Sequence, residues 1–405
     1  MWELVRANKR KSLMLFFSMG IVLLALGFFI GMYVYPEGGG IYGMSIALIL
    51  WAVLSIISFF SGSKILLMLS HAKEVTPDVH PKLFNVVEEM KIAAGLPKMP
   101  KVYIINEEAP NAFATGYKPN NSAIAVTSGL LARLNRDELQ GVVAHETAHI
   151  FNRDVQFMTI AGIMLGSIVL ISQIFLRGML YSGGRRYSSG GKGGGQAQII
   201  ILIIALVFAI LAPIFAQLLY YAISRKREYL ADATAVRFTR YPEGLASALE
   251  KLSQNTQELP VANKVTAGMY IINPLKRKGL KMTDLSSTHP PISERIRILR
   301  GIAGGAGLAQ YQAAYQSVKG NKSQIIPDSG MKEFGDLELR GAGSESKTQA
   351  TARENKRVLG DLMMSVSNFV FLGCNCGLKI KVPPDYKKPS VECPRCGHQN
   401  FVVIK

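Results

Sequence analysis

The segment Val142–Asp154, VVAHETAHIFNRD, carries two histidines and a glutamate at a spacing that suits metal chemistry. His145 and His149 are four residues apart, so on a helix their side chains project from one face. Glu146 follows the first histidine and completes an H-E-x-x-H pattern. In this pattern the two imidazoles bind zinc and the glutamate acts as a general base on water. The same five letters also fit a helix with two surface histidines.

A catalytic zinc usually takes three protein ligands and leaves its fourth position for water. The four histidines outside the pattern are His71, His80, His289 and His398. None lies in a ligand-like context, although His289, in STHPPISERI, is predicted to be a polar active-site residue. Glu228 is a better third ligand, because in REYLADA it stands four residues before Asp232 on the same helical face. Asp232 would then accept a hydrogen bond from a zinc-binding imidazole. The alternative to the ligand role is that Glu228 belongs to an ordinary acidic helix surface or forms a salt bridge with the basic residues before it.

Four long uncharged stretches would each cross the hydrocarbon of a bilayer as a helix, which takes about 20 apolar residues. They are Leu13–Tyr35, Ile41–Ser63, Val155–Leu176 and Ile199–Ile223. The first is too long for a signal peptide, so we expect a retained span. A partly inserted hairpin is the alternative for the third and fourth. Two spans separate His149 from Glu228, and an even number returns the chain to the same membrane side.

The formal net charge of +18 suggests a nucleic-acid partner, but the pattern of charges argues against one. Lysines and arginines gather at the ends of the apolar stretches, where they meet anionic lipid head groups, and no groove-reading motif accompanies them. The basic residues before the first span predict a cytoplasmic N-terminus in a multi-pass protein of the cell's inner (plasma) membrane. The catalytic domain and C-terminus would then be cytoplasmic too. Arg177, Arg185, Arg186 and Lys192, after the third span, oppose this orientation.

Between the second and third spans the pattern alternates between helix and strand. PKLFNVVEEMKIAAGLP has helical periodicity and ends in a stop signal, and KVYIIN and SAIAVTSGLL are strand-like runs on either side of NAFATGY. Asn135, with Glu138 three residues later, predicts the capped start of the H-E-x-x-H helix. We expect this helix to lead into the third span.

The only four cysteines, Cys374, Cys376, Cys393 and Cys396, stand in two close pairs, each followed by glycine. Paired thiols in a reducing compartment indicate a metal rather than a disulfide. The spacing C-x-C, 16 residues, C-x-x-C predicts a zinc ribbon with four thiolate ligands. A redox dithiol is the alternative.

HETAHIFNRD, SRKREYLADATA, NAFATG and STHPPISERIRIL together resemble the HtpX-like zinc metalloproteases, relatives of the CaaX-processing endopeptidases, over about residues 1–300. The resemblance implies that His145, His149 and Glu228 bind zinc and that Glu146 is the general base. It also implies that Asn111–Gly116, with Asn111, Ala112, Phe113 and Ala114, forms an edge strand that binds substrate. His289 and Arg295 would contact the substrate or its oxyanion.

The sequence therefore predicts a mainly α membrane protein, with four transmembrane helices, an α+β zincin-like (gluzincin) catalytic domain and a small β zinc-ribbon domain. The expected divisions are two spans in 1–68, protease segments in 69–154 and 225–316, spans three and four in 155–224 with a Gly-rich loop at 182–198, a disordered linker in 317–355, and the ribbon in 356–405. The expected activity is zinc-dependent endopeptidase cleavage of membrane or misfolded proteins in quality control, with one catalytic and one structural zinc ion. A CaaX-type processing endopeptidase and a non-catalytic scaffold that binds a partner through the ribbon are the alternatives. The sequence does not indicate an oligomeric state.

Overall fold

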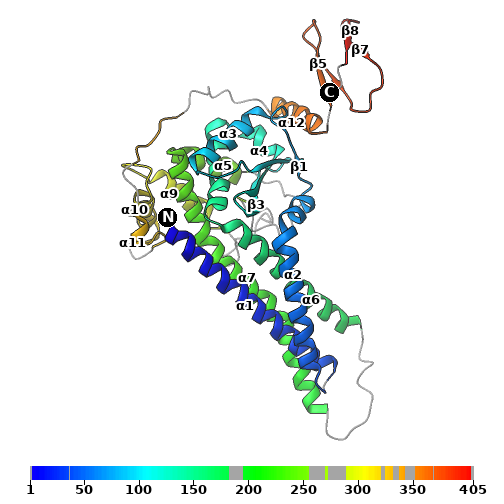
Figure 1. Ribbon diagram of the computed structural model, residues 1–405, viewed down its shortest axis with the longest axis vertical. Helices are drawn as coiled ribbons and strands as arrows, with labels where there is room; N and C mark the ends of the chain where they lie inside the picture. Colours follow the sequence, from blue (N-terminus) through cyan, green and yellow to red (C-terminus); the bar gives the residue numbers. More distant parts are fainter. Residues whose placement is uncertain are drawn as a thin grey trace.

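The computed structural model describes residues 2–35, 37–181, 195–254, 270–271, 289–320, 324–331, 337–342, 352–367 and 369–402. Four long helices form a stalk below an α+β domain (Figure 1). They are α1 (Trp2–Val34), α2 (Gly39–Leu69), α6 (Asp154–Tyr181) and α7 (Gly195–Thr239). Their apolar stretches long enough to cross a membrane are Ser12–Val34, Gly39–Leu69, Met158–Met179 and Ile199–Leu219. The four predicted membrane helices are confirmed, whereas residues 182–194 of the expected Gly-rich loop lie outside the described residues.

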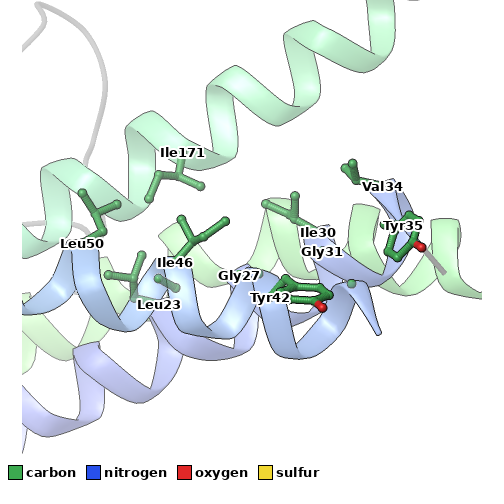
Figure 2. A pocket seen from close by; sticks show the side chains of 13 residues that line it. Leu23, Gly27, Ile30, Gly31, Val34, Tyr35, Tyr42, Ile46, Leu50 and Ile171 are labelled. Carbon is green, nitrogen blue, oxygen red and sulfur yellow. The ribbon is translucent and has the colours of Figure 1, made fainter. Parts of the chain in front are cut away.

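Glycines let α1 and α2 approach closely, as small residues do between membrane helices. A Cβ atom added at Gly31 would lie 2.1 Å from the carbonyl oxygen of Gly39, and one at Gly43 would lie 2.2 Å from that of Gly27. Beside this contact, a cavity of about 450 Å³ is lined by α1, α2 and Ile171 of α6 (Figure 2). Its lining is almost wholly apolar and contains none of the predicted site residues, so it is not the catalytic cleft.

A four-stranded sheet lies in the domain above the stalk. Its strands are β1 (Lys73–Glu74), β2 (Lys101–Ile105), β3 (Ala112–Lys118) and β4 (Asn121–Thr127), in the order β1-β2-β4-β3. β2 and β4 are parallel, and β3 runs antiparallel to β4 at the edge of the sheet. The predicted run SAIAVTSGLL is strand only up to Thr127, because the Thr127 hydroxyl accepts a hydrogen bond from the Leu130 amide and caps the short helix α4 (Ser128–Arg133).

The helix α5 (Arg136–Phe151) carries the H-E-x-x-H residues along one face of the sheet. Its N-terminus has the predicted capping box, in which the side chains of Asn135 and Glu138 each accept a hydrogen bond from the other's backbone amide. It does not lead into the third span as expected. Arg153 has φ 61°, a left-handed conformation that a right-handed helix does not accommodate, so the chain breaks there and α6 begins at Asp154.

Further helices complete the domain. They are α3 (Pro81–Ala93), α8 (Pro242–Ser253), α9 (Ile292–Arg300), α10 (Leu308–Lys319) and α11 (Asp328–Met331). Their buried apolar residues join those of β2, β4 and α5 in one core. Beyond its membrane span, α7 continues without a break into this core, where Tyr229, Ala233 and Val236 are buried. One helix thus joins the bilayer to the interior of the catalytic domain.

Parts of the expected disordered linker lie against the domain. Ile326 is fully buried, the Leu337 carbonyl accepts a hydrogen bond from the Ala306 amide, and Arg340 pairs with Asp137 at 2.8 Å. The prediction of disorder is wrong for these residues. Low apolar content suggested disorder, but a few well-placed side chains are enough to hold a short segment on an existing core.

The C-terminal residues form two small hairpins after α12 (Ala352–Val366). β5 (Val370–Gly373) pairs with β6 (Lys379–Val382), and β7 (Ser390–Glu392) pairs with β8 (Gln399–Phe401). Leu362 of α12 packs into the core of the catalytic domain, and Asp361 of the same helix pairs with Lys381 at 2.7 Å. The hairpins are therefore attached to the domain through α12.

Candidate metal centre

Three side chains from two helices converge above the membrane spans. His145 and His149 of α5 place their Nε2 atoms 3.2 Å apart. Glu228 of α7 lies 3.5 Å from the first through Oε2 and 3.4 Å from the second through Oε1. The structure thus brings together the three residues that the sequence analysis proposed as ligands, although 79 positions separate His149 from Glu228.

The separations among these atoms fit a zinc ion. Ligand atoms arranged tetrahedrally at zinc bonds of about 2.0–2.1 Å lie about 3.3 Å from one another. The Nε2–Nε2 separation of 3.2 Å and the separations of 3.5 and 3.4 Å from each Nε2 atom to a Glu228 oxygen are close to this value, although the two histidines face different oxygens of that carboxylate. Two neutral imidazoles and one carboxylate are also a donor set that zinc accepts in catalytic sites.

Asp232 orients the first histidine. Its Oδ1 lies 2.9 Å from Nδ1 of His145, so that the opposite ring nitrogen, Nε2, faces Glu228. Asp232 is itself held by Arg295 of α9, which donates to both carboxylate oxygens at 2.7 and 2.8 Å. All three side chains are fully buried. Asp232 therefore has the contact that the sequence analysis expected of it.

Arg295 and His289 also lie at this centre. The Arg295 guanidinium donates to the carbonyl oxygen of Ile271 at 3.2 Å and lies 3.4 Å from Oε2 of Glu228. His289 is buried, with its Nε2 atom 3.8 Å from the same oxygen. Arg295 thus contacts Asp232, Glu228 and Ile271, and His289 lies close to Glu228.

Glu146 projects from α5 beside the histidines. Its side chain is only 1% exposed, and among the residues that the structure describes no donor reaches either carboxylate oxygen with normal hydrogen-bond geometry. A cavity of about 20 Å³ lies against it, lined also by Ala114, His149 and Glu228. A buried carboxylate without a donor costs free energy, so its retention here points to a role with a ligand or reactant.

Burial and neighbouring charges set the proton affinities of the centre. Burial alone raises the pKa of Glu228, but His289, His145 and His149 outweigh it and hold that pKa well below its usual range. Burial lowers the pKa of His149, but hydrogen bonds with Asp154 and Glu228 outweigh this and raise it well above 6.5. Burial raises the pKa of Glu146 and lowers that of His289 to about 4. His289 is therefore neutral at physiological pH.

The edge strand β3 runs beside the centre. Asn111, just before β3, accepts from the Thr127 amide through its carbonyl oxygen, so its backbone faces β4. Alternate residues of a strand face opposite sides, and the Ala112 carbonyl accordingly accepts from the Ile271 amide at 3.0 Å. Phe113 stacks edge-to-face on Tyr270, with the ring centroids 5.1 Å apart. Ala114 is the next residue whose backbone faces away from β4.

Asp154 was not identified from the sequence. Its Oδ2 lies 3.2 Å from Nδ1 of His149, and its side chain is fully buried. The sequence did contain a pointer to this residue, because Asp154 is the last residue of the HETAHIFNRD motif, five positions after the second histidine. On a continuous helix, however, a residue at i+5 projects about 140° away, and only the break at Arg153 brings the carboxylate back.

The four cysteines form a second cluster. Sγ of Cys374 lies 3.4 Å from that of Cys396, Sγ of Cys376 lies 3.6 Å from that of Cys393, and all four lie within 4.8 Å of one another. Tetrahedral thiolates at zinc bonds of about 2.3 Å are about 3.8 Å apart, so the cluster fits that ion. Gly377 and Gly397, with φ 80° and 72°, close the two predicted Cys–Gly turns.

Comparisons with known proteins identify the family of this chain. Residues 77–303 match the model of peptidase family M48. A protease HtpX homolog of Dictyoglomus thermophilum is 44% identical over 299 residues, which is 74% of this chain and 94% of the relative. A homolog of Streptococcus uberis is 41% identical over 300 residues, 74% of this chain and 99% of the relative. The crystal structure of S. mikatae Ste24p aligns with 74% of this chain and 67% of its own, at 20% identity and a TM-score of 0.39.

The family model covers more than half of the chain and ends before α10, so the four-cysteine module lies outside it. The matched region contains both histidines, Glu146, Glu228 and the membrane helices α6 and α7. The chain belongs to peptidase family M48 and is a membrane zinc metalloprotease.

Proposed function

We propose that this protease cleaves peptide bonds of membrane or misfolded proteins at a zinc ion held by His145, His149 and Glu228. The observation that carries the proposal is the close approach of these three side chains, whose ligand atoms all lie within 4.8 Å of one another, with the carboxylate of Glu146 beside them. When bound, zinc polarises the scissile carbonyl and lowers the pKa of the attacking water toward about 7.

Glu146 is the general base in this proposal. Its carboxylate lies against the small cavity beside His149, and a raised pKa suits a group that takes a proton from water and returns it to the leaving amine. In this proposal neutral His289, whose Nε2 atom lies 3.8 Å from Glu228, would donate a hydrogen bond to the oxyanion. Arg295 acts through Asp232 and Glu228, which it contacts directly, and keeps both carboxylates charged and oriented.

Substrate would pair with the outer edge of β3. Ala114 presents its backbone to the cavity that Glu146 also lines, so an extended peptide bonded there would carry its scissile bond past the metal. Pairing through backbone hydrogen bonds discriminates little between substrate side chains. This low selectivity suits a protease that acts on many damaged proteins. Asn111, Ala112 and Phe113 form the upstream end of the same edge, where the Ile271 amide already occupies the Ala112 carbonyl.

Glu146→Gln separates chemistry from metal binding. We expect the purified variant to keep the zinc content of the parent protein, because no ligand is changed, and to lose cleavage of an unfolded or membrane substrate by at least about 10³-fold, since no other group takes the proton. Zinc analysis and a gel-based cleavage assay measure the two properties. His149→Ala, which removes a ligand, is the control that should lose both. Parent-like turnover by Glu146→Gln would remove Glu146 from this role.

We further propose that the catalytic domain and C-terminus face the cytoplasm from the inner (plasma) membrane. The N-terminus of α1 lies beside this domain (Figure 1), and the exposed residues Arg6, Lys9 and Arg10 of α1 therefore share its membrane side. The four cysteines bind a second, structural zinc ion in this proposal, and their ribbon recruits a substrate or partner to the protease.

A further inference from the structure

A second aspartate lies behind the other proposed ligand. Asp154 is the first residue of α6, and its Oδ2 atom lies 3.2 Å from Nδ1 of His149. The carboxylate is fully buried, whereas the histidine ring is 14% exposed. A buried carboxylate at a ring nitrogen opposite the metal side fixes the tautomer and the direction of the ring.

Arg227 approaches the same carboxylate from α7. Its Nε atom lies 3.8 Å from Oδ1 of Asp154, and a terminal nitrogen donates to the Ser12 hydroxyl at 2.6 Å. Only 3% of the Arg227 surface is exposed, although its neighbour Lys226 is exposed to solvent. A buried guanidinium beside a buried carboxylate offsets its negative charge, and Ser12 connects the pair to the start of the first membrane span.

The same arrangement occurs at the other histidine. His145 contacts Asp232 and Asp232 contacts Arg295, with all contacts between 2.7 and 2.9 Å. The Asp232 arrangement is contributed by α5, α7 and α9, and the Asp154 arrangement by α5, α6 and α7. The two histidines are therefore oriented by separate sets of residues. Both sets include α7, and only the second also includes α6 and reaches Ser12 of α1.

We propose that Asp154 is a positioning residue for His149 and that Arg227 holds it in place, so that the zinc site is oriented in part from the membrane spans. The proposal rests on the zinc site proposed above. The Asp154 carboxylate accepts a hydrogen bond from Nδ1–H of His149 and leaves the Nε2 lone pair directed at the metal. The positive charge of Arg227 offsets the free-energy cost of burying the Asp154 carboxylate. The hydrogen bond from Arg227 to Ser12 connects the guanidinium to α1.

The test is zinc affinity, measured by competition with a chelator on the full-length protein in detergent. All variants carry Glu146→Gln, so that self-cleavage does not alter the sample, and the cysteine-bound ion is counted separately by releasing it with a thiol-reactive mercurial. We expect Asp154→Asn, which still offers an oxygen to Nδ1, to weaken zinc binding about 10-fold, and Asp154→Ala about 100-fold. Arg227→Gln should fall between the parent and Asp154→Ala.

Asp137→Asn is the matched control, because it removes a carboxylate from α5 that pairs with Arg340 away from the metal centre. It should keep parent affinity. Thermal unfolding of the zinc-free proteins distinguishes positioning from general destabilisation: the proposal requires Asp154→Asn to melt near the parent without zinc and to gain less stability on zinc addition. Parent-like affinity in both Asp154 variants overturns the proposal. If His149→Ala also keeps parent affinity, the proposed zinc site itself is wrong.

Discussion

Both proposed zinc-binding histidines are more basic in the metal-free protein than free histidine. Hydrogen bonds with Asp154 and Glu228 raise the pKa of His149 well above 6.5, and those with Asp232 and Glu228 raise the pKa of His145, in each case against the lowering effect of burial. The carboxylates that orient the rings therefore also stabilise the protonated form of each imidazole. Protons then compete with zinc for the ring nitrogens.

Zinc retention should accordingly depend on pH. Because the pKa of His149 is raised, the metal-free site binds protons even near neutral pH, and zinc has to displace them. Zinc affinity should therefore rise with pH through neutrality and fall as the pH is lowered. Dialysis against a fixed zinc buffer at several pH values, followed by metal analysis, measures this. An affinity that is constant between pH 6 and 8 would contradict the raised pKa.

At the scale of elements, the site depends on how closely α5 packs against its neighbours. Gly141 of α5 faces the N-terminal turn of α8, where an added Cβ atom would lie 2.6 Å from the Leu245 amide nitrogen. Since that neighbour is backbone, it cannot rotate away. The glycine thus fixes the distance between α5 and α8 one turn before His145.

Gly141→Ala should destabilise the domain by about 1–3 kcal/mol, the usual cost of overpacking, and lower the thermal unfolding midpoint. Gly360→Ala in α12 is the matched control, since an added Cβ there meets nothing within 4 Å. That variant should be neutral or slightly stabilising, because alanine is the better helix former. Differential scanning fluorimetry in detergent compares the two, and equal midpoints would refute the packing argument.

For the whole molecule, one helix connects bilayer and active site. α7 begins as a membrane span, passes Pro213, and ends in the catalytic core with Glu228 and Asp232 on its inner face. α6 contributes Asp154 where it enters the membrane region. Movement of these spans relative to α5 would shift Glu228 and Asp154 relative to both histidines, because Glu228 is on α7 and Asp154 is on α6.

The whole chain should bind two zinc ions. Metal analysis of pure protein is expected to give two ions per chain, and chelation should release one ion from the histidines and one from the cysteines. The ribbon is too small to be stable on its apolar surface alone, so loss of its ion should unfold it. Alkylation of native protein measures this: the four thiols should be protected with zinc and reactive without it. A count of one ion, with all four thiols reactive, would refute the ribbon site.

Several features follow from the sequence because they depend only on nearby residues. Four apolar stretches predict four membrane helices, since length and hydropathy decide insertion. Helical spacing places His145 and His149 on one face, and Asn135 with Glu138 marks where that helix begins. The turn at each Cys–Gly pair is equally local, because only glycine readily takes the positive φ seen at Gly377 and Gly397.

The tertiary structure decided the contacts that bring distant segments together. Asp154 reaches His149 because Arg153 breaks the helix, and Arg295 turns toward Asp232 because α9 packs beside α7. The Ile271 amide donates to the Ala112 carbonyl at the edge of β3, a contact between distant segments that no local pattern predicts. Residue types and spacing determine which metal chemistry the chain is able to perform. The partners that orient each ligand depend on packing between elements far apart in the chain, where the free-energy differences are sums over many weak contacts.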